Sequence, residues 1–121
     1  MANTLMYGGS PGYTIVGTNT LNAGVARGRF IKSDFTGYAD VSDDSAGVSL
    51  FAALDDEGVV CQVSNVVLVE AGAAIAAKFN QLATDNVGRV IDYSSGTVRG
   101  KNLDTASAAG DFIRVLLNPV G

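Results

Sequence analysis

The chain contains no histidine and no tryptophan, and it has one cysteine and two prolines among 121 residues. Without histidine it cannot build a Ser-His-Asp or Cys-His nucleophile system, or the common zinc sites that use imidazole. A single cysteine, Cys61, cannot form a disulfide within the chain, so nothing here depends on an oxidising compartment. Because Cys61 stands in an apolar stretch with no base beside it, we expect a buried core thiol. An enzyme is therefore a poor interpretation.

Positive charge is also scarce. Eight Lys and Arg residues face twelve Asp and Glu residues, which gives a formal net charge of −4, and no two basic residues are adjacent. Nucleic-acid surfaces need clustered Lys and Arg for phosphate contacts, so we expect no nucleic-acid partner. No apolar run approaches the roughly 18 residues of a membrane helix, and the start lacks the features of a secretory signal. We expect a soluble protein made in a cytoplasm, with no membrane partner.

What the chain does contain is small and apolar residues. Hydrophobic residues make up 47% of it, and there are 15 glycines. This composition suits a single compact domain of short strands joined by many turns. We expect a mainly β fold, with strands near residues 13–17, 28–33, 37–41, 47–51, 59–68, 87–92, 97–101 and 111–117.

The two halves of the chain resemble each other. An Ala-Gly step, an apolar stretch and a Gly-containing turn recur in both, and a later glycine leads to a turn with Gly beside an acid. We therefore predict an internal repeat over about 21–64 and 69–117, within one domain at 13–121. With so many Ala and Gly residues, chance similarity is the alternative.

Aligning Gly58 with Gly110 predicts the register of the strand that follows each turn. Side chains alternate across a strand, so the apolar positions should face the core and the polar ones should face water or a neighbour. The expected core residues are Cys61, Val63, Ile113 and Val115. The expected outward residues are Gln62 and Arg114.

The segment 71–79 allows two interpretations. Leu68, Gly72, Ile75, Phe79 and Leu82 form a stripe at helical spacing, which predicts a short helix. The glycine on that stripe and the β-like counterpart in the first half favour an irregular β connection instead.

The first twelve residues show no period. They are either a frayed terminus or a flexible arm that becomes ordered against a partner. In the second case Met6, Tyr7 and Tyr13 would be its apolar anchors, and the arm could add a strand to the edge of a partner's sheet.

No pattern of residues points to a metal or a cofactor. Two acidic clusters, Asp40 with Asp43 and Asp44 and the run 55–57, lack the alternating spacing of a calcium loop, so we interpret them as solvated turn residues. No phosphate-binding glycine loop is present. Arg27, Arg29 and Arg99 alternate with apolar residues, and we expect them on the outer face of strands.

The stretch VEAGAAIAAKFNQLATDNVGRVIDYSSGTVRGKNLDTASAAGDFIRVLLNP resembles the C-terminal half of the small bacteriophage capsid cement, or decoration, proteins. The resemblance rests on an A-G-x-x-I-A-A segment at 71–77, a D-x-x-G-R turn at 85–89, a strand at 100–103 and the ending A-S-A-A-G-D followed by apolar residues at 106–117. The first half fits the same family's earlier strands, so the resemblance covers about 21–118. The segment VRGKNLDT departs from the family's more apolar strand.

This resemblance implies a structural virion protein on the outer capsid surface. It implies a compact β-barrel or β-tulip-like domain, a homotrimer, and binding to the major capsid protein, whose neighbouring subunits it would cement against the pressure of packaged DNA. Met6, Tyr7 and Tyr13 become candidate capsid-binding residues. The alternatives are another head-fibre, spike or tail β protein, or a ligand-binding β module, for which exposed aromatic residues would be needed.

Overall fold

The computed structural model describes residues 14–20 and 24–117, and all structural statements below refer to them. The described residues form nine strands and no helix, which confirms the mainly β prediction. The strands are β1 (Thr14–Thr18), β2 (Phe30–Lys32), β3 (Ser45–Ser49), β4 (Gly58–Gln62), β5 (Val66–Glu70), β6 (Gln81–Thr84), β7 (Val90–Asp92), β8 (Gly100–Asn102) and β9 (Phe112–Leu117).

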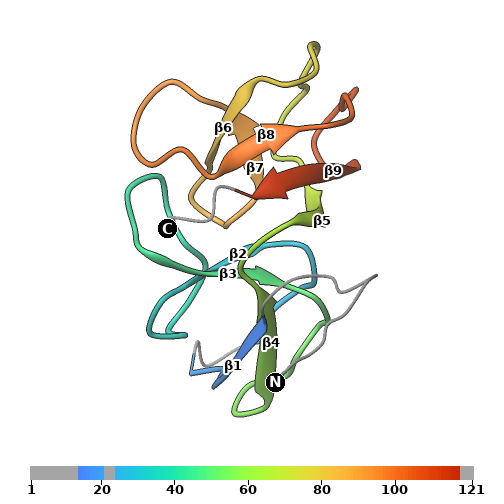
Figure 1. Ribbon diagram of the computed structural model, residues 1–121. Coiled ribbons are helices and arrows are strands. Elements are labelled where there is room, and N and C mark those ends of the chain that lie inside the picture. The colour runs from blue at the N-terminus through green and yellow to red at the C-terminus, as the bar shows by residue number, and fades with distance from the viewer. Residues whose placement is uncertain (1–13, 21–23, 118–121) are drawn as a thin grey trace, which may run out of the picture.

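These strands build two antiparallel sheets, which lie at opposite ends of the molecule in Figure 1. The first has the order β1-β4-β3-β2 and the second the order β5-β9-β8-β6-β7. Neither sheet closes on itself, so the β-barrel or β-tulip shape implied by the resemblance is corrected to two open sheets. None of the described residues forms a helix long and apolar enough to cross a membrane.

Strand β9 shows why these residues form strands. Along it, exposed and buried side chains alternate strictly, with Ile113, Val115 and Leu117 buried and Arg114 exposed. This period of two is the pattern of a strand with one face on a core, and it confirms the register predicted for this strand.

Three strand predictions needed correction. The predicted strand 59–68 is two strands, β4 and β5, which belong to different sheets. The chain bends at Asn65, whose φ of 65° lies in the left-handed region. The predicted strand 37–41 is an irregular segment with an isolated bridge between Ile31 and Tyr38. Strand β6 was not predicted, because Leu82, Ala83 and Thr84 are all buried and therefore show no alternation.

The bend between the two sheets also explains an error in the predicted register. Gln62 was expected to face outward, but it is buried. Its Nε2 donates to the carbonyl oxygens of Ser64 and Val66, at 2.7 and 3.0 Å. The side chain therefore holds the connection between β4 and β5, and a buried amide with satisfied partners is tolerated. Val63 lies just past the end of β4 and is half-buried rather than in the core.

The segment 71–79 is an irregular β connection, and the predicted short helix is absent. Ala71 and Ile75 form isolated bridges with Val90 and Ala106. The helical stripe was misleading because its members do not share a face: Ile75 is buried, whereas Phe79 is 64% exposed.

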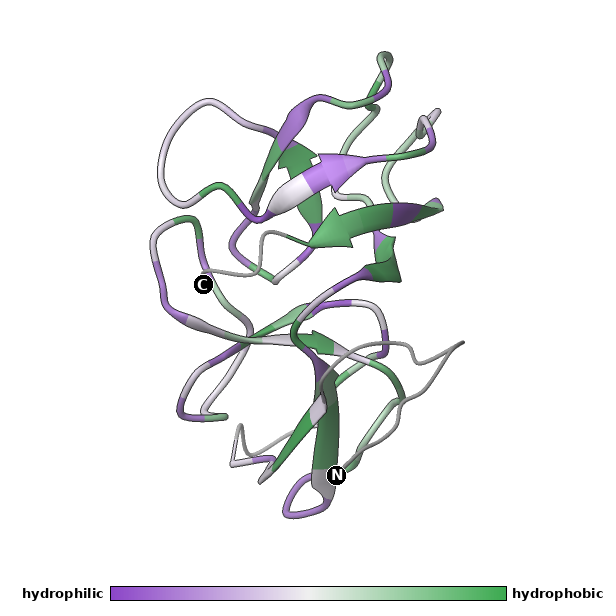
Figure 2. Ribbon diagram, viewed as in Figure 1, coloured by the Kyte–Doolittle hydropathy of each residue, from purple (hydrophilic) through white to green (hydrophobic). Residues whose placement is uncertain are grey.

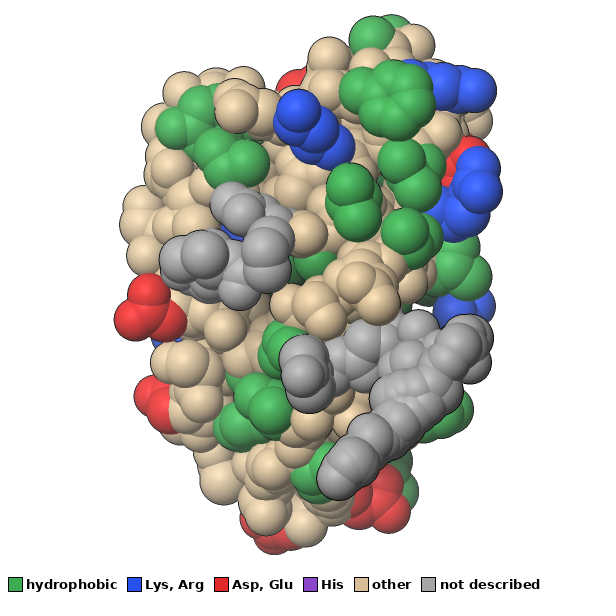
Figure 3. Space-filling view, in the orientation of Figure 1, with side chains coloured by type: hydrophobic (Ala, Val, Ile, Leu, Met, Phe, Trp, Pro, Cys, Tyr) green, Lys and Arg blue, Asp and Glu red, His purple; other side chains and the backbone are tan. Residues whose placement is uncertain are grey.

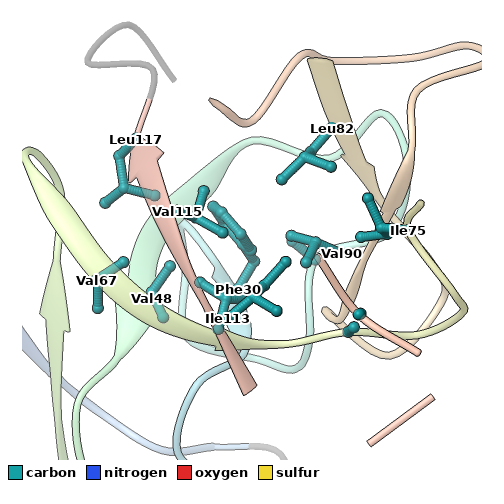
Figure 4. Close-up of a cluster of buried hydrophobic side chains, with 13 residues drawn as sticks. Phe30, Val48, Val67, Ile75, Leu82, Val90, Ile113, Val115 and Leu117 are labelled. Atoms are coloured by element: carbon teal, nitrogen blue, oxygen red, sulfur yellow. The ribbon is translucent and has the colours of Figure 1, made fainter. Parts of the chain in front are cut away.

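The core is shared between the sheets. The larger apolar cluster contains Phe30, Ala39 and Val48 from the first half together with residues of the second half. Figure 4 shows Phe30 and Val48 beside Ile113 and Val115. A smaller cluster lies within the first half and includes Val59 and Cys61. Figure 2 shows the hydrophobic strands β4, β5 and β9. Because one cluster needs side chains from both halves, the sheets pack as one unit.

Ion pairs and hydrogen bonds also join the halves. Glu70 at the end of β5 accepts from Arg29, with Arg29 Nη2 and Glu70 Oε1 3.2 Å apart. Arg99 is buried, and its Nη2 donates to the carbonyl oxygens of Asp40 and Asp43 at 2.8 and 2.6 Å. Its burial lowers the pKa of the guanidinium, and nearby Asp43 opposes this. The expectation that Arg99 lies on an outer face was wrong, because its backbone-carbonyl partners come from a distant loop.

Candidate binding surface

The described residues offer no chemical centre. No group of three or more Cys, Asp or Glu residues among them could hold a metal ion. The Cys61 thiol is fully buried, and burial raises its pKa to about 12. A thiol that stays protonated at neutral pH is a poor nucleophile. The predicted core role of Cys61 is therefore confirmed.

The two acidic clusters shape turns, as predicted from the sequence. The Asp43 carboxylate accepts the backbone N–H of Asp40 at 2.9 Å. Glu57 Oε1 accepts the backbone N–H of Leu54 at 2.7 Å. Each carboxylate thus satisfies a donor within its own turn, which is the ordinary structural role of acids in turns.

An apolar surface covers the outer side of β5 and β9. Val66, Leu68, Phe112 and Leu116, together called the apolar face here, are 42, 46, 39 and 46% exposed. They are neighbours because β5 pairs with β9, with Val66 opposite Leu116 and Leu68 opposite Arg114. Large apolar side chains gathered on one exposed sheet face are typical of an interaction surface.

Basic side chains border the apolar face. The Arg27 guanidinium lies over the Phe112 ring, 4.4 Å from its centroid. Lys101 stands opposite Leu116 on the neighbouring strand β8. Figure 3 shows Lys and Arg side chains beside hydrophobic ones at this end of the molecule. A partner that buries this surface should therefore be apolar and acidic.

Arg114 also lies on this side, where it is paired. Its Nη2 is 2.8 Å from Asp104 Oδ1, and its backbone N–H and Nε donate to Asp104 Oδ2. The hydrogen bond from Arg114 is the main cause that lowers the pKa of Asp104. This pair fixes the orientation of Arg114 across the middle of the face.

A cleft of about 260 Å³ opens beside the apolar face. Val66 and Leu68 line one side of it, and Arg27 and Leu50 are among its other lining residues. The face and the cleft therefore share residues and form one continuous surface. A separate shallow depression of about 240 Å³ contains Tyr93 with Asn80, Gln81 and Asp92.

A second exposed surface lies on the connection between β3 and β4. Residues 51–57, called the acidic loop here, carry Phe51 and Leu54, which are 65 and 68% exposed. The same loop carries the acidic run 55–57, whose three side chains are exposed. It lies at the end of the molecule beyond β1 and β4, away from β8 and β9 (Figure 1).

Sequence reasoning named other candidates. Met6, Tyr7 and Tyr13, and the predicted arm 1–12, lie outside the described residues. The apolar face was missed because an apolar residue on a strand is normally assigned to the core. The sequence did contain an indication. The stretch VVLVE at 66–70 is apolar on both faces of the strand, and only one face is needed for the core of an antiparallel sheet, so the other is apolar and exposed.

The fold has a solved counterpart. The chain is similar to the crystal structure of the head fibre gp8.5 N base of bacteriophage phi29, with a TM-score of 0.64 and 17% sequence identity over 88% of this chain and 96% of that one. At this identity the likeness concerns the fold alone. No curated protein matches the sequence of this chain.

The family comparison covers nearly the whole chain. The model of the phage cement proteins matches residues 9–117, which include both sheets, the apolar face and the acidic loop. The resemblance seen in the sequence is thereby confirmed. This chain belongs to the phage cement protein family and is a structural protein of the phage head.

Proposed function

We propose that this protein binds the outer surface of a phage capsid and cements neighbouring major capsid subunits, so that the head resists the pressure of its packaged DNA. The observation that carries the proposal is the family match over residues 9–117. The described residues agree with it, because they offer apolar and charged binding surfaces and no metal cluster or reactive thiol. We propose the head surface as its place in the virion after synthesis in the host cytoplasm.

The mechanism is multivalent binding. We propose a homotrimer, in which each copy contacts a different capsid subunit. Once one contact has formed, the next ones form at a high effective concentration, so the shell gains more stability than a single contact gives. Because the trimer binds the assembled shell and not separated subunits, it also shifts the equilibrium toward the intact shell.

Cosedimentation tests this function. Purified protein is mixed with mature, expanded heads and with unexpanded procapsids, and the pelleted fraction is measured. We expect binding to expanded heads and an increase in the temperature at which those heads release DNA. The function is wrong if the protein pellets with neither particle.

We propose that residues 1–12 form an arm that adds to this binding, with Met6, Tyr7 and Tyr13 as its apolar anchors. Deletion of 1–12 should weaken head binding and leave the circular dichroism spectrum and the unfolding midpoint unchanged. A full-length variant with Met6→Ser, Tyr7→Ser and Tyr13→Ser tests the anchors and keeps the chain length. Unchanged head occupancy in both variants would refute the arm.

The fold likeness favours a second candidate, the base of a head fibre, because the similar solved structure is described as a head fibre N base. Electron microscopy of saturated heads separates the two. Cementing predicts compact density over several capsid subunits, whereas a fibre base predicts density that continues outward from the shell.

A further inference from the structure

The apolar face is separate from the side of the second sheet that forms the core. The residues that alternate with it along β5 and β9 are buried in the shared core: Val67, Val69, Ile113 and Val115. Because side chains alternate across a strand, the opposite side of β5 and β9 forms the core. Apolar side chains at Val66 and Leu116 are therefore not needed to build it.

The two exposed surfaces complement each other in charge. The apolar face is bordered by Arg27 and Lys101, and the acidic loop carries exposed Asp56 and Glu57 beside its apolar side chains. One of these two surfaces thus has basic side chains at its border, and the other carries acidic ones. Opposite charges at the rim of a contact select the partner and its orientation.

The two surfaces also complement each other in shape. Leu54 and Phe51 are the most exposed large apolar side chains of the acidic loop, at 68 and 65%. The cleft beside Val66 and Leu68 is concave and partly apolar. A projecting apolar side chain in an apolar cleft is the usual anchor of a protein contact.

We propose that the acidic loop of one copy of this chain docks on the apolar face and its cleft in a second copy. Because the loop and the face are two different surfaces of one copy, each copy uses both, and three copies close a ring in which every surface is occupied once. This inference deepens the proposed homotrimer and names its contact.

Charge reversal tests the contact in the full-length chain. The face variant carries Arg27→Glu and Lys101→Glu, and the loop variant carries Asp55→Lys and Asp56→Lys. Sedimentation equilibrium should give a trimer for the natural chain and a monomer for each variant alone. An equimolar mixture of the two variants should associate again, because each variant supplies the charge that the other lacks. Circular dichroism verifies that both variants are folded.

The apolar contribution is tested by Leu68→Thr with Leu116→Gln, which should weaken association about tenfold or more. Tyr93→Ser, a change of an exposed ring outside both surfaces, is the matched control and should leave association unchanged. A monomeric natural chain, variants that remain trimeric, or a mixture that fails to associate would each overturn the contact.

The test is separate from that of the proposed function. Association is measured without heads, whereas cementing is measured by head binding. A natural chain that sediments with heads but stays monomeric in solution refutes the contact and leaves the function standing. A chain that forms the trimer but binds no head refutes the proposed function and leaves the contact standing.

Discussion

The two sheets share one strand topology and differ in their side chains. The order β1-β4-β3-β2 corresponds to β5-β9-β8-β6, with β7 added at the edge of the second sheet. An isolated bridge joins Val25 to Ala53 in the first half, and one joins Ile75 to Ala106 in the second. Equivalent backbones thus carry different side chains: Val16 lies opposite Val60 in the first sheet where Leu68 lies opposite Arg114 in the second. The strand pairing therefore does not depend on the side chains at these positions.

One buried polar side chain in each half makes the same pair of hydrogen bonds to the backbone. Ser49 Oγ donates to the Ala26 carbonyl oxygen at 2.8 Å, and Asn102 Nδ2 donates to the Ala77 carbonyl oxygen at 2.6 Å. Each residue also accepts a backbone N–H, from Arg29 and Asn80 respectively. These networks support the predicted repeat over 21–64 and 69–117, which we propose as a duplication of one unit.

Under the proposed repeat, the backbone geometry favours a different alignment from the one used for the sequence. Gly110 corresponds to Asp56 and not to Gly58: both have positive φ, at 96 and 65°, and their N–H groups donate to the carbonyl oxygens of Ala71 and Asn19. A shift by two residues keeps the same faces inward. Cys61 and Val115 were therefore correctly assigned to the core.

The largest expected effect comes from two equivalent glycines. A Cβ at Gly47 would collide with the Gln62 carbonyl oxygen, and one at Gly100 with the Leu116 carbonyl oxygen. Gly47→Ala and Gly100→Ala should each lower the free energy of unfolding by about 2–4 kcal/mol, measured by urea denaturation. Gly110→Ala is the control: its φ is positive but the space around it is open, so it should cost about 1 kcal/mol. If only one of the two sheet glycines proves sensitive, the sheets are less alike than their topology indicates.

A smaller effect is expected at the equivalent polar residues. Ser49→Ala and Asn102→Ala should each destabilise the fold by about 1–3 kcal/mol, because buried backbone groups lose their partners. Asn102→Ala should cost more, since Nδ2 also donates to the Asp104 carbonyl oxygen and the larger side chain leaves a cavity. Thermal unfolding of both variants measures the difference. If Ser49→Ala destabilises the fold as much as Asn102→Ala or more, the additional hydrogen bond of Asn102 does not add to stability.

The smallest effect is confined to the second sheet and depends on pH. The pKa of Asp104 lies below its ordinary value of 3.8, mainly because of the hydrogen bond from Arg114. Its ionised form therefore stabilises the fold above the unfolded pKa, and this contribution is lost as the pH falls through the lower folded pKa. Asp104→Asn should make the unfolding midpoint less sensitive to pH between about 5 and about 2. Arg114→Gln should have a similar effect, and a steeper dependence in either variant would argue against the pair.

The sequence predicted those strands in which apolar and polar residues alternate in step with the buried and exposed sides of the sheet. Strand β9 alternates between core and solvent, so Ile113 and Arg114 were placed correctly. Arg99 was misplaced because its partners, the carbonyl oxygens of Asp40 and Asp43, are distant in the sequence and only the folded chain brings them near. Gln62 was misplaced because the bend between β4 and β5, where its side chain donates to nearby carbonyl oxygens, was not predicted. The apolar face was missed because an apolar strand residue is normally assigned to the core, and the sequence does not show which side of β5 packs against the rest of the molecule.

The shared core has a consequence for how such a protein would be lost from a particle. Phe30 and Val48 of the first sheet pack in one cluster with Val69 and Ile113 of the second, so melting either sheet exposes apolar surface of the other. Unfolding should therefore be a single cooperative transition, without a state in which one sheet survives alone. Heat would then leave each copy either fully competent to bind or entirely unfolded, and a decorated particle would keep its attachment up to a sharp threshold.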